Sequence, residues 1–436
     1  MLEKKNMYRF PWSLNDNPIG WVEVSDICNI HCKGCYRSTL GGHKSLEELK
    51  KEVLFMKEWR NVDNITLAGG EPLIYPHLFE LCKFIRKQKL KVHILSNGLA
   101  LTPELVRKLK KAKVGSMTIH IDRNQKRADR DGEQTDMDFC ALRERFAKMI
   151  HKIHPRLTLT FGLTIYNQNV NEIPDLVRWG IKNAKYFSGY VFIMYRGVPI
   201  EAGVEYTNTS GEKVKIEADT LGYTTNEMGE INIETKDVCE KVREAVPIYE
   251  PAAYLGGTMT HEAFKWTAGV FLVAGKKVVG QMGPKSMELI QSMHHLFYKS
   301  YMIYAKHKYR GRKYFLLGLF DKFVRKAFGR FLLHSLLPWR FFSPIHMFNI
   351  GTVQAPDLYA DGRADMCDAC PDITYWDGRL VHSCRLDEWR LFGGYLNAQV
   401  LGKHSREEVL SRKVAEVQAA ANDEGGEAEP GKVGAP

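Results

Sequence analysis

The chain has 436 residues, of which 44% are hydrophobic, so it is long enough for two or three domains and can bury a sizeable core. Its 62 Lys and Arg residues exceed its 51 Asp and Glu residues, which gives a formal net charge of +11. No stretch reaches the ~18 consecutive apolar residues of a membrane-spanning helix, the N-terminal residues lack the apolar core of a secretory signal, and nine cysteines do not make a disulfide-rich scaffold. We therefore expect a basic, cytoplasmic protein with reduced cysteines.

The first half of the chain alternates short β-rich runs with helical patterns. The predicted strands begin at Trp21, Ile65, Lys91, Ser116, Leu157 and Tyr190. This spacing is typical of βαβ units, which form a parallel sheet, either doubly wound or closed toward a barrel. In both architectures the functional groups gather at the C-terminal ends of the strands.

Two helix starts are marked by capping residues between these strands. Ser45 and Glu48 have the spacing of a capping box, and an apolar helical pattern follows them. Thr102 precedes Pro103, which favours the first position of a helix. The sequence therefore predicts helices that begin after Ser45 and after Thr102.

The βα pattern ends near Val204, and the composition then changes several times. Residues 206–285 have the composition of a linker or insertion with weak strand character, and residues 286–346 are rich in basic and aromatic side chains. Cysteines return within residues 347–400. Residues 401–436 form a tail that we expect to be disordered at its small, polar end.

Three cysteines follow the first predicted strand: Cys28, Cys32 and Cys35. Three thiolates within eight residues can converge on one soft metal centre. One interpretation is a structural zinc site completed by a fourth ligand such as His31. Unrelated buried thiols are a second interpretation, and an iron–sulfur cluster with one open iron is a third.

Polar residues also follow the next three predicted strands. The second strand ends in Gly69, Gly70, Glu71 and Pro72, the third in Ser96, Asn97 and Gly98, and the fourth in His120, Ile121 and Asp122. Glycines allow a ligand to approach the backbone closely, and Glu71 offers a carboxylate to an amino group. Because these groups follow successive strands of one sheet, we expect them to form a single site with the three cysteines.

In the order and spacing of these motifs the sequence resembles the radical S-adenosylmethionine (SAM) enzymes. The resemblance covers roughly residues 15–205 and implies an α/β fold, a partial (βα)6 barrel. It implies a [4Fe–4S] cluster on Cys28, Cys32 and Cys35, whose open iron chelates the methionine part of SAM. The implied SAM contacts are Gly34, Tyr36, Gly69, Gly70, Glu71, Pro72, Ser96, Asn97, Asp122 and Arg196. Many members carry a bulky residue before the third cysteine, where this chain has Gly34.

A second group of cysteines lies near the C-terminus: Cys367, Cys370 and Cys384. Asp377 and Gly378 between two β-rich runs predict a tight hairpin turn before the third of them. A zinc site completed by His382 is one interpretation. The layout is also similar to the auxiliary-cluster extensions of SPASM and twitch type, reduced to at most one iron–sulfur cluster. Cys239 is either its fourth ligand or inert, while Cys82 and Cys140 have the pattern of buried bystanders.

Residues 296–344 contain eleven Lys or Arg and a single acid, Asp321. From residue 316 onward a helical pattern places Leu316, Phe320, Phe323, Ala327 and Phe331 on one face and Lys322, Arg325, Lys326 and Arg330 on another. Such a helix, followed by Trp339, Phe341 and Phe342, can lie in the interface of an anionic membrane. An ordinary helix packed on the core is the alternative, and we do not expect a nucleic-acid partner.

These observations lead to one main hypothesis and two alternatives. The main hypothesis is a radical SAM enzyme that abstracts hydrogen from an apolar, lipid or lipid-linked substrate and receives electrons from a flavodoxin or ferredoxin. We expect such an enzyme in the cytoplasm, bound peripherally to the inner face of the membrane. The first alternative is a SPASM-like maturase that modifies a peptide or protein. The second is a non-catalytic iron–sulfur or zinc protein that associates with RNA.

Overall fold

The structure is a computed structural model. It describes residues 2–37, 41–129, 134–195, 198–199, 204–217, 220–222, 224–225, 233–260, 263–304, 311–336, 338–358 and 364–400.

Six parallel strands form the first part of the main sheet, and they lie side by side in chain order. They are β2 (Ile19–Ser25), β4 (Asn64–Gly69), β5 (Lys91–Ser96), β6 (Ser116–His120), β8 (Thr158–Ile165) and β9 (Gly189–Met194). A doubly wound sheet would reverse its strand order at a switch point, whereas this order never reverses. The predicted α/β fold with a partial (βα)6 barrel is confirmed.

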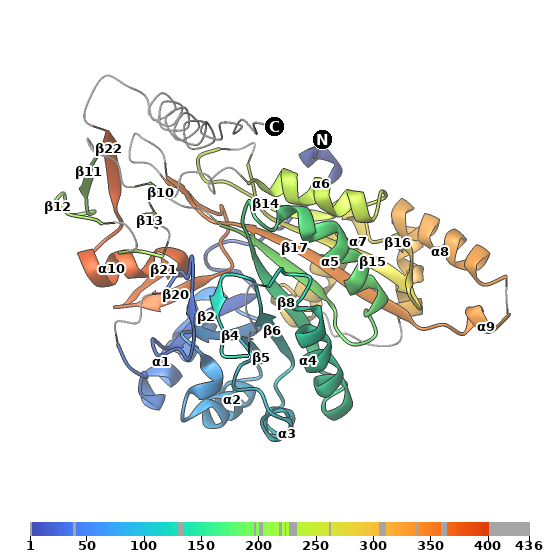
Figure 1. Cartoon of the computed structure of the whole chain (residues 1–436), viewed down its shortest axis with the longest axis horizontal. Coiled ribbons are helices and arrows are strands. Elements are labelled where there is room, and N and C mark those ends of the chain that lie inside the picture. The colour runs from blue at the N-terminus through green and yellow to red at the C-terminus, as the bar shows by residue number, and fades with distance from the viewer. Residues whose placement is uncertain are drawn as a thin grey trace, which may run out of the picture.

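The helices that connect these strands cover the outer face of the sheet (Figure 1). They are α1 (Leu46–Arg60), α2 (Leu78–Lys87), α3 (Pro103–Lys111), α4 (Cys140–Ile153) and α5 (Ile173–Lys182). Both predicted helix starts are confirmed. The Ser45 hydroxyl accepts a hydrogen bond from the Glu48 amide, and the Thr102 hydroxyl accepts one from the Leu105 amide, each at 3.2 Å.

The sheet continues beyond β9 with strands from the second half of the chain. Strand β17 (Ile345–Gln354) pairs parallel with β9, and β15 (Phe264–Ala274) pairs antiparallel with β17. Strands β14 (Ala253–Gly256) and β16 (Lys277–Gln281) pair with β15, and β1 (Tyr8–Arg9) pairs with β14. The segment 206–285, expected to be a linker or insertion, therefore contributes three strands to the main sheet. Helix α6 (Thr235–Ala245) packs against α5 and β15.

The C-terminal cysteines belong to a small unit beside the start of the barrel. Strands β20 (Ile373–Trp376) and β21 (Arg379–His382) form the predicted hairpin, and its turn residues Asp377 and Gly378 both have positive φ, at 44° and 78°. Helix α10 (Leu386–Phe392) follows, and β20 contacts β2 and α1.

Short elements complete the described chain. Strands β3 (His31–Cys32) and β7 (Gln125–Lys126) pair with each other, as do β10 (Val198–Pro199) with β13 (Thr224–Thr225) and β18 (Asp357–Leu358) with β19 (Ala364–Asp365). Strands β11 (Val204–Thr207), β12 (Lys213–Val214) and β22 (Asn397–Val400) form a small sheet. The 3-10 helices are η1 (Lys4–Asn6), η2 (Pro72–Ile74), η3 (Val170–Glu172), η5 (Gly311–Leu319) and η6 (Ser383–Arg385).

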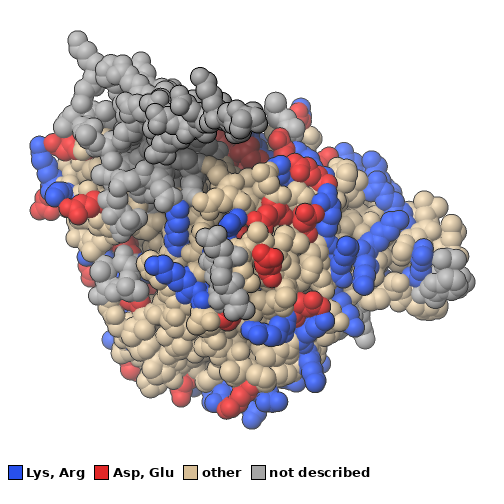
Figure 2. Space-filling view, in the orientation of Figure 1, with Lys and Arg blue, Asp and Glu red and all other residues tan. Residues whose placement is uncertain are grey.

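Helix α7 (Pro284–Tyr298), η5, α8 (Lys322–His334) and α9 (Pro338–Phe341) form the basic region, and Lys and Arg side chains gather over α8 (Figure 2). The predicted apolar face of α8 requires a correction. Ala327 and Phe331 are buried with Val324 against β16 and do not face outward. Leu316 and Phe320 precede α8 and are exposed. None of the described helices has both the length and the hydrophobicity needed to cross a bilayer.

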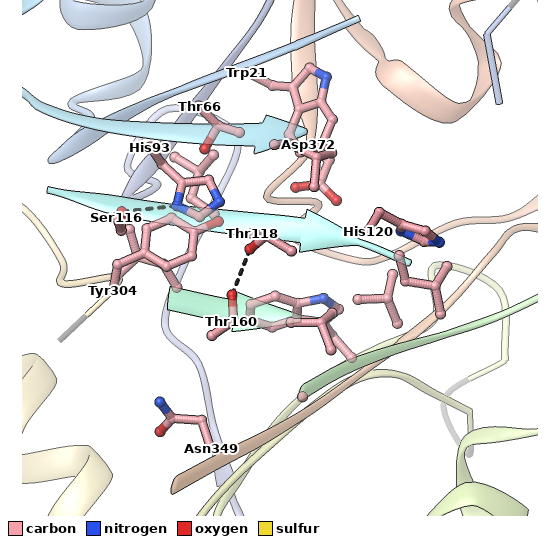
Figure 3. Close-up of a pocket in the computed structure, with 18 of the residues that line it drawn as sticks. Trp21, Thr66, His93, Ser116, Thr118, His120, Thr160, Tyr304, Asn349 and Asp372 are labelled. Atoms are coloured by element: carbon pink, nitrogen blue, oxygen red, sulfur yellow. Dashed lines mark hydrogen bonds between the residues drawn. The ribbon is translucent and has the colours of Figure 1, made fainter. Parts of the chain in front are cut away.

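The inner face of the barrel strands carries hydrogen-bonding side chains (Figure 3). His93 Nδ1 lies 2.9 Å from the Ser116 hydroxyl, and the ring of Tyr304 stacks on His93 with 3.9 Å between ring centroids. The hydroxyls of Thr118 and Thr160 are 2.6 Å apart. The barrel therefore encloses a polar lumen in which His93 is almost completely buried.

Burial lowers the pKa of His93 to about 3, so protonation of the unfolded chain below pH ~6.5 should destabilise the fold. When the pH falls from 7 to 5, the free energy of unfolding of the wild type should decrease by about 2 kcal/mol more than that of His93→Gln. Urea denaturation at the two pH values measures this difference. His77→Gln, at an exposed position, should keep the wild-type pH dependence. Identical pH dependence in wild type and His93→Gln would contradict this assignment.

Candidate functional site

The first cysteine group lies in the loop that follows β2, and the ends of the neighbouring strands hold this loop. Cys32 pairs with Gln125 through β3 and β7, and the Gly70 amide donates a hydrogen bond of 2.6 Å to the Ser25 carbonyl. A Cβ on Gly70 would lie 2.1 Å from the Ile27 carbonyl oxygen, so only glycine permits this approach. The Gly69-Gly70 pair thus allows the end of β4 to pack directly against the cysteine loop.

Glu71 is buried and joins the ends of β4 and β5. One carboxylate oxygen accepts hydrogen bonds of 2.8 Å from the Leu73 amide and the Ser96 hydroxyl, and the other accepts one of 2.8 Å from the Asn97 amide. Burial raises the pKa of Glu71. The resemblance implied that Glu71 meets the amino group of SAM. Both oxygens accept from protein donors, and the implied contact between Glu71 and SAM stays a prediction.

Ser96 and Asn97 also have partners within the protein. Ser96 accepts a hydrogen bond of 2.9 Å from the Gly98 amide while it donates to Glu71. The Asn97 side-chain amide donates to Asn29 at 2.8 Å and lies 3.7 Å from the sulfur of Cys28. These two residues therefore organise the cysteine loop, and their implied contacts with ribose stay a prediction.

Asp122 lies beside the second cysteine of the loop. Its carboxylate accepts hydrogen bonds from His120 Nε2 at 2.8 Å and from the Asn124 amide at 2.9 Å. Burial acts to raise the pKa of Asp122, but these hydrogen bonds hold it below its ordinary value. The resulting negative charge helps to keep the neighbouring Cys32 protonated in the metal-free chain. The implied contact between Asp122 and SAM stays a prediction.

Two aromatic residues that the sequence analysis did not single out complete the top of the barrel. Tyr166 directly follows β8 and donates a hydrogen bond of 2.8 Å to the Lys33 carbonyl, and Tyr195 directly follows β9. Their ring centroids are 5.1 Å apart. The ring of Tyr195 fills the space where Gly34 would carry a side chain, and this explains why a small residue precedes Cys35. An aromatic residue directly after a barrel strand was the signal that could have identified them.

The remaining implied SAM contacts have different outcomes. Tyr36 packs its ring edge against Trp21, with ring centroids 6.2 Å apart. Pro72 is buried at the start of η2. Arg196 lies outside the described residues.

Burial raises the pKa of Cys28, Cys32 and Cys35, and at Cys32 and Cys35 the neighbouring thiols add to the rise. Three neighbouring thiols are a suitable donor set for an iron–sulfur cluster once they lose their protons. In the described part of the chain no three His, Cys, Asp or Glu side chains are arranged to hold a single metal ion. The ligand roles of these cysteines therefore stay a prediction.

A buried cluster of charges joins the first cysteine loop to α10. The Arg37 guanidinium lies 3.1 Å from the carboxylate of Glu23 and 2.6 Å from those of Asp26 and Asp387. Arg390 pairs with Asp26 and Asp387 as well. The C-terminal unit is thus fixed to the loop that carries Cys35.

The C-terminal cysteines also form one group. Cys370 is hydrogen-bonded to Cys367, and the charge of Cys370 acts on the pKa of Cys384. Arg60 donates a hydrogen bond of 3.1 Å to the Cys370 carbonyl from α1, and this bond fixes the loop to the barrel. Cys239 is buried elsewhere, in contact with Tyr249 and Thr267. We therefore assign Cys239 to the core and not to this group.

Both cysteine groups line one cavity of about 1920 Å³ that continues through the barrel lumen. The side chains of His93, Thr118, Thr160 and Asn349 project into it, and Trp21 and Asp372 lie above them (Figure 3). Burial raises the pKa of Asp372 to about 7. The cysteines that line the cavity are Cys28, Cys32, Cys35, Cys367, Cys370 and Cys384.

Comparison with known proteins identifies the domain that carries the first cysteine group. The model of the radical SAM superfamily matches residues 22–180, which include the three cysteines and the ends of β4, β5 and β6. Residues 22–180 therefore form a radical SAM domain. A radical SAM domain implies a [4Fe–4S] cluster and SAM as cofactors, and the three thiols beside the cavity fit such a cluster.

Individual relatives match only part of this chain. The AdoMet-dependent heme synthase of Methanosarcina barkeri is 34% identical over 110 residues, 24% of this chain and 30% of that protein. The mycofactocin maturase MftC of Mycobacterium tuberculosis is 27% identical over 104 residues, 23% of this chain and 26% of that protein. The crystal structure of Streptococcus suis SuiB bound to S-adenosylmethionine aligns with a TM-score of 0.35 at 17% identity, over 48% of this chain and 45% of that one. The chain thus spans less than half the length of each of these relatives.

The hydrogen bonds of Glu71 predict a structural effect of its removal. Glu71→Ala should lower the free energy of unfolding by about 3 kcal/mol, because three buried donors lose their acceptor. Glu80→Ala, at an exposed position of α2, should stay within about 0.5 kcal/mol of wild type. Chemical denaturation of the three proteins measures the difference. Equal stability of the two variants would show that Glu71 does not tie the strand ends together.

Proposed function

We propose that the protein is a radical SAM enzyme whose SAM-binding [4Fe–4S] cluster is held by Cys28, Cys32 and Cys35. When bound, this cluster and SAM supply a 5′-deoxyadenosyl radical that can abstract hydrogen from an unactivated C–H bond. The observation that carries the proposal is the single cavity of about 1920 Å³ that both cysteine groups line. A substrate in this cavity lies next to the first group and also within reach of the second.

The chain itself positions the reactants and excludes water from them. The Glu71 carboxylate and the Asn97 amide hold the cysteine loop against the strand ends. Tyr166 and Tyr195 pack beneath the loop at Lys33 and Gly34. Fixed geometry and restricted water access are the main contributions that a protein makes to cofactor-based radical chemistry.

We further propose that Cys367, Cys370 and Cys384 hold an auxiliary iron–sulfur cluster. The three thiols lie in one group, and hydrogen bonds from Arg60 and Asn17 fix the carbonyl of Cys370. Their position on the same cavity suits electron exchange with a bound substrate. We propose that external electrons come from a flavodoxin or ferredoxin.

SAM cleavage tests the catalytic proposal. Anaerobically reconstituted protein reduced with dithionite should convert SAM to 5′-deoxyadenosine and methionine, as measured by liquid chromatography. Replacement of Cys28, Cys32 and Cys35 by Ala should abolish this reaction and leave part of the bound iron. Replacement of Cys82, a buried residue outside the cavity, by Ala should preserve both the reaction and the iron content. A cysteine-loop variant that keeps all its iron would contradict the ligand assignment.

We also propose that the basic region binds an anionic membrane. Large apolar side chains that are 67–79% exposed lie on this surface: Leu316, Leu319, Phe320, Leu333, Leu336 and Phe342. Exposed cations lie among them: Lys322, Arg325, Lys326, Arg330 and Arg340. The carboxylate of Asp321 is buried and caps α8, so it adds no negative charge to the surface. Exposed apolar and cationic side chains together suit the interface of an anionic leaflet.

This surface supports a substrate that resides in the membrane, and we propose a lipid or lipid-linked molecule. Hydrogen abstraction suits the unactivated C–H bonds of such a substrate. The alternative is a peptide or protein maturase, which the resemblance to the mycofactocin maturase favours. A maturase of soluble peptides would not require vesicle binding.

Vesicle sedimentation tests the membrane proposal. The protein should bind vesicles that contain phosphatidylglycerol more strongly than phosphatidylcholine vesicles, at about 1 kcal/mol per basic residue near the surface. Charge reversal at Lys322, Arg325, Lys326 and Arg330 should remove most of this preference. Leu316→Ser with Phe320→Ser should instead lower the binding that persists in high salt.

Leu54→Ser, at an exposed site on α1, is the matched apolar control and should bind vesicles as the wild type does. Equal binding of the wild type to both vesicle types would rule out the membrane surface.

A further inference from the structure

The cavity has a second end that the radical SAM chemistry does not use. From the cysteine loops it passes along the polar lumen to the N-terminal ends of β5, β6 and β8, where Lys91, Gly115 and Arg156 line it. At about 3.3 Å per residue, β5 separates this end from the cysteine end by about 17 Å. The lumen therefore has room for a group that extends from one end to the other.

Basic side chains surround this second end, which we call the basic mouth. They are Arg86, Lys89, Lys91, Lys110, Lys113, Arg156 and Lys313. The carboxylate that lines the mouth is Asp63, and Lys91 pairs with it at 2.5 Å. Lys89, Lys113 and Arg156 are exposed, and they take part in none of the ion pairs among the described residues. The mouth therefore carries a strong excess of positive charge.

Helix dipoles account for only part of this arrangement. Lys89 and Lys113 follow the C-terminal ends of α2 and α3 with positive φ of 67° and 59°, and a cation is favourable at such an end. Lys87 and Lys111 lie in the last turns of the same helices and would interact equally well with the helix dipoles, but they do not line the cavity. The dipoles therefore do not explain why Lys89 and Lys113 lie at the mouth. Cations from the ends of three helices and from η5 surround one opening. This arrangement suits an anionic ligand.

Helix α7 also lines the cavity, with the aromatic and apolar side chains of Tyr298, Ile290 and Met287 and the polar side chains of Gln291 and His294. Tyr298 lines the cavity and is nevertheless 72% exposed, so the cavity reaches the surface beside it. Tyr314 lines the cavity as well. Leu296 and Phe297, which precede Tyr298 on α7, are exposed by 60% and 69%.

We propose that the basic mouth binds the phosphate of a membrane phospholipid or lipid-linked phosphate, with its hydrocarbon chain along α7. The polar group on the other side of the phosphate then extends into the lumen of His93, Thr118 and Thr160, toward the cysteines. This inference rests on the proposed function only in so far as the bound lipid is the substrate of the radical reaction. The binding itself is independent of SAM and iron.

The experiment measures binding of a fluorescent single-chain phospholipid, NBD-labelled lysophosphatidylglycerol below its micellar concentration, to the full chain. An NBD-labelled monoacylglycerol of the same chain length is the neutral probe. The mouth variant carries Lys89→Gln, Lys113→Gln and Arg156→Gln. The matched control carries Lys83→Gln, Lys87→Gln and Lys111→Gln, which are exposed cations of the same two helices that do not line the cavity.

The wild type and the control should bind the phospholipid probe roughly tenfold or more tightly than the neutral probe, and the mouth variant should lose this preference. Equal affinity of the mouth variant and the control for the phospholipid probe would overturn the proposal. The proposal would also be overturned if inorganic phosphate displaced the probe as effectively as unlabelled lysophosphatidylglycerol does, because the site would then recognise free phosphate. Formation of 5′-deoxyadenosine without substrate, measured in the same variants, should be unchanged. Its failure in the wild type would refute the proposed reaction and leave the binding result standing.

Discussion

The buried guanidinium of Arg37 lies among the carboxylates of Glu23, Asp26 and Asp387, and these contacts join the first cysteine loop to α10. Burying these charges costs solvation free energy, which offsets much of their mutual attraction, so the cluster fixes the geometry of the site more than it adds to the stability of the fold. Loss of one partner would leave an uncompensated buried charge. Because Arg37 follows Cys35 and Asp387 follows Cys384, the same contacts set the two cysteine groups on one cavity. The arrangement of the site therefore depends on this cluster.

Local signals predicted the first half of the fold well. The alternation of strands and helices, the caps at Ser45 and Thr102 and the turn at Asp377 and Gly378 all depend on residues close in sequence. Strands β14 to β17 were not recognised. The segment of β14 to β16 has only weak strand character in its sequence, although these strands pair with close neighbours, and the partners of β17 lie far away in the chain. The apolar period of α8 was recognised, but a period does not tell whether the stripe faces a sheet or a lipid surface.

The candidate site divides in the same way. Sequence motifs located the three cysteines and the strand ends around them, because each motif directly follows a strand. They could not reveal that the Glu71 carboxylate joins two strand ends through hydrogen bonds, since this depends on the register between β4 and β5. The sequence also did not predict the basic mouth, because its cations come from separate helix ends that only the folded barrel brings together.

The central claim is that both cysteine groups hold clusters that face one cavity. Pulsed electron paramagnetic resonance of the reconstituted, reduced protein tests it through the spin relaxation of the cluster on Cys28, Cys32 and Cys35. We expect this cluster to relax faster in the wild type than in a variant with Cys367, Cys370 and Cys384 replaced by Ala, because a second paramagnet lies across the cavity. Identical relaxation in both proteins would contradict the account.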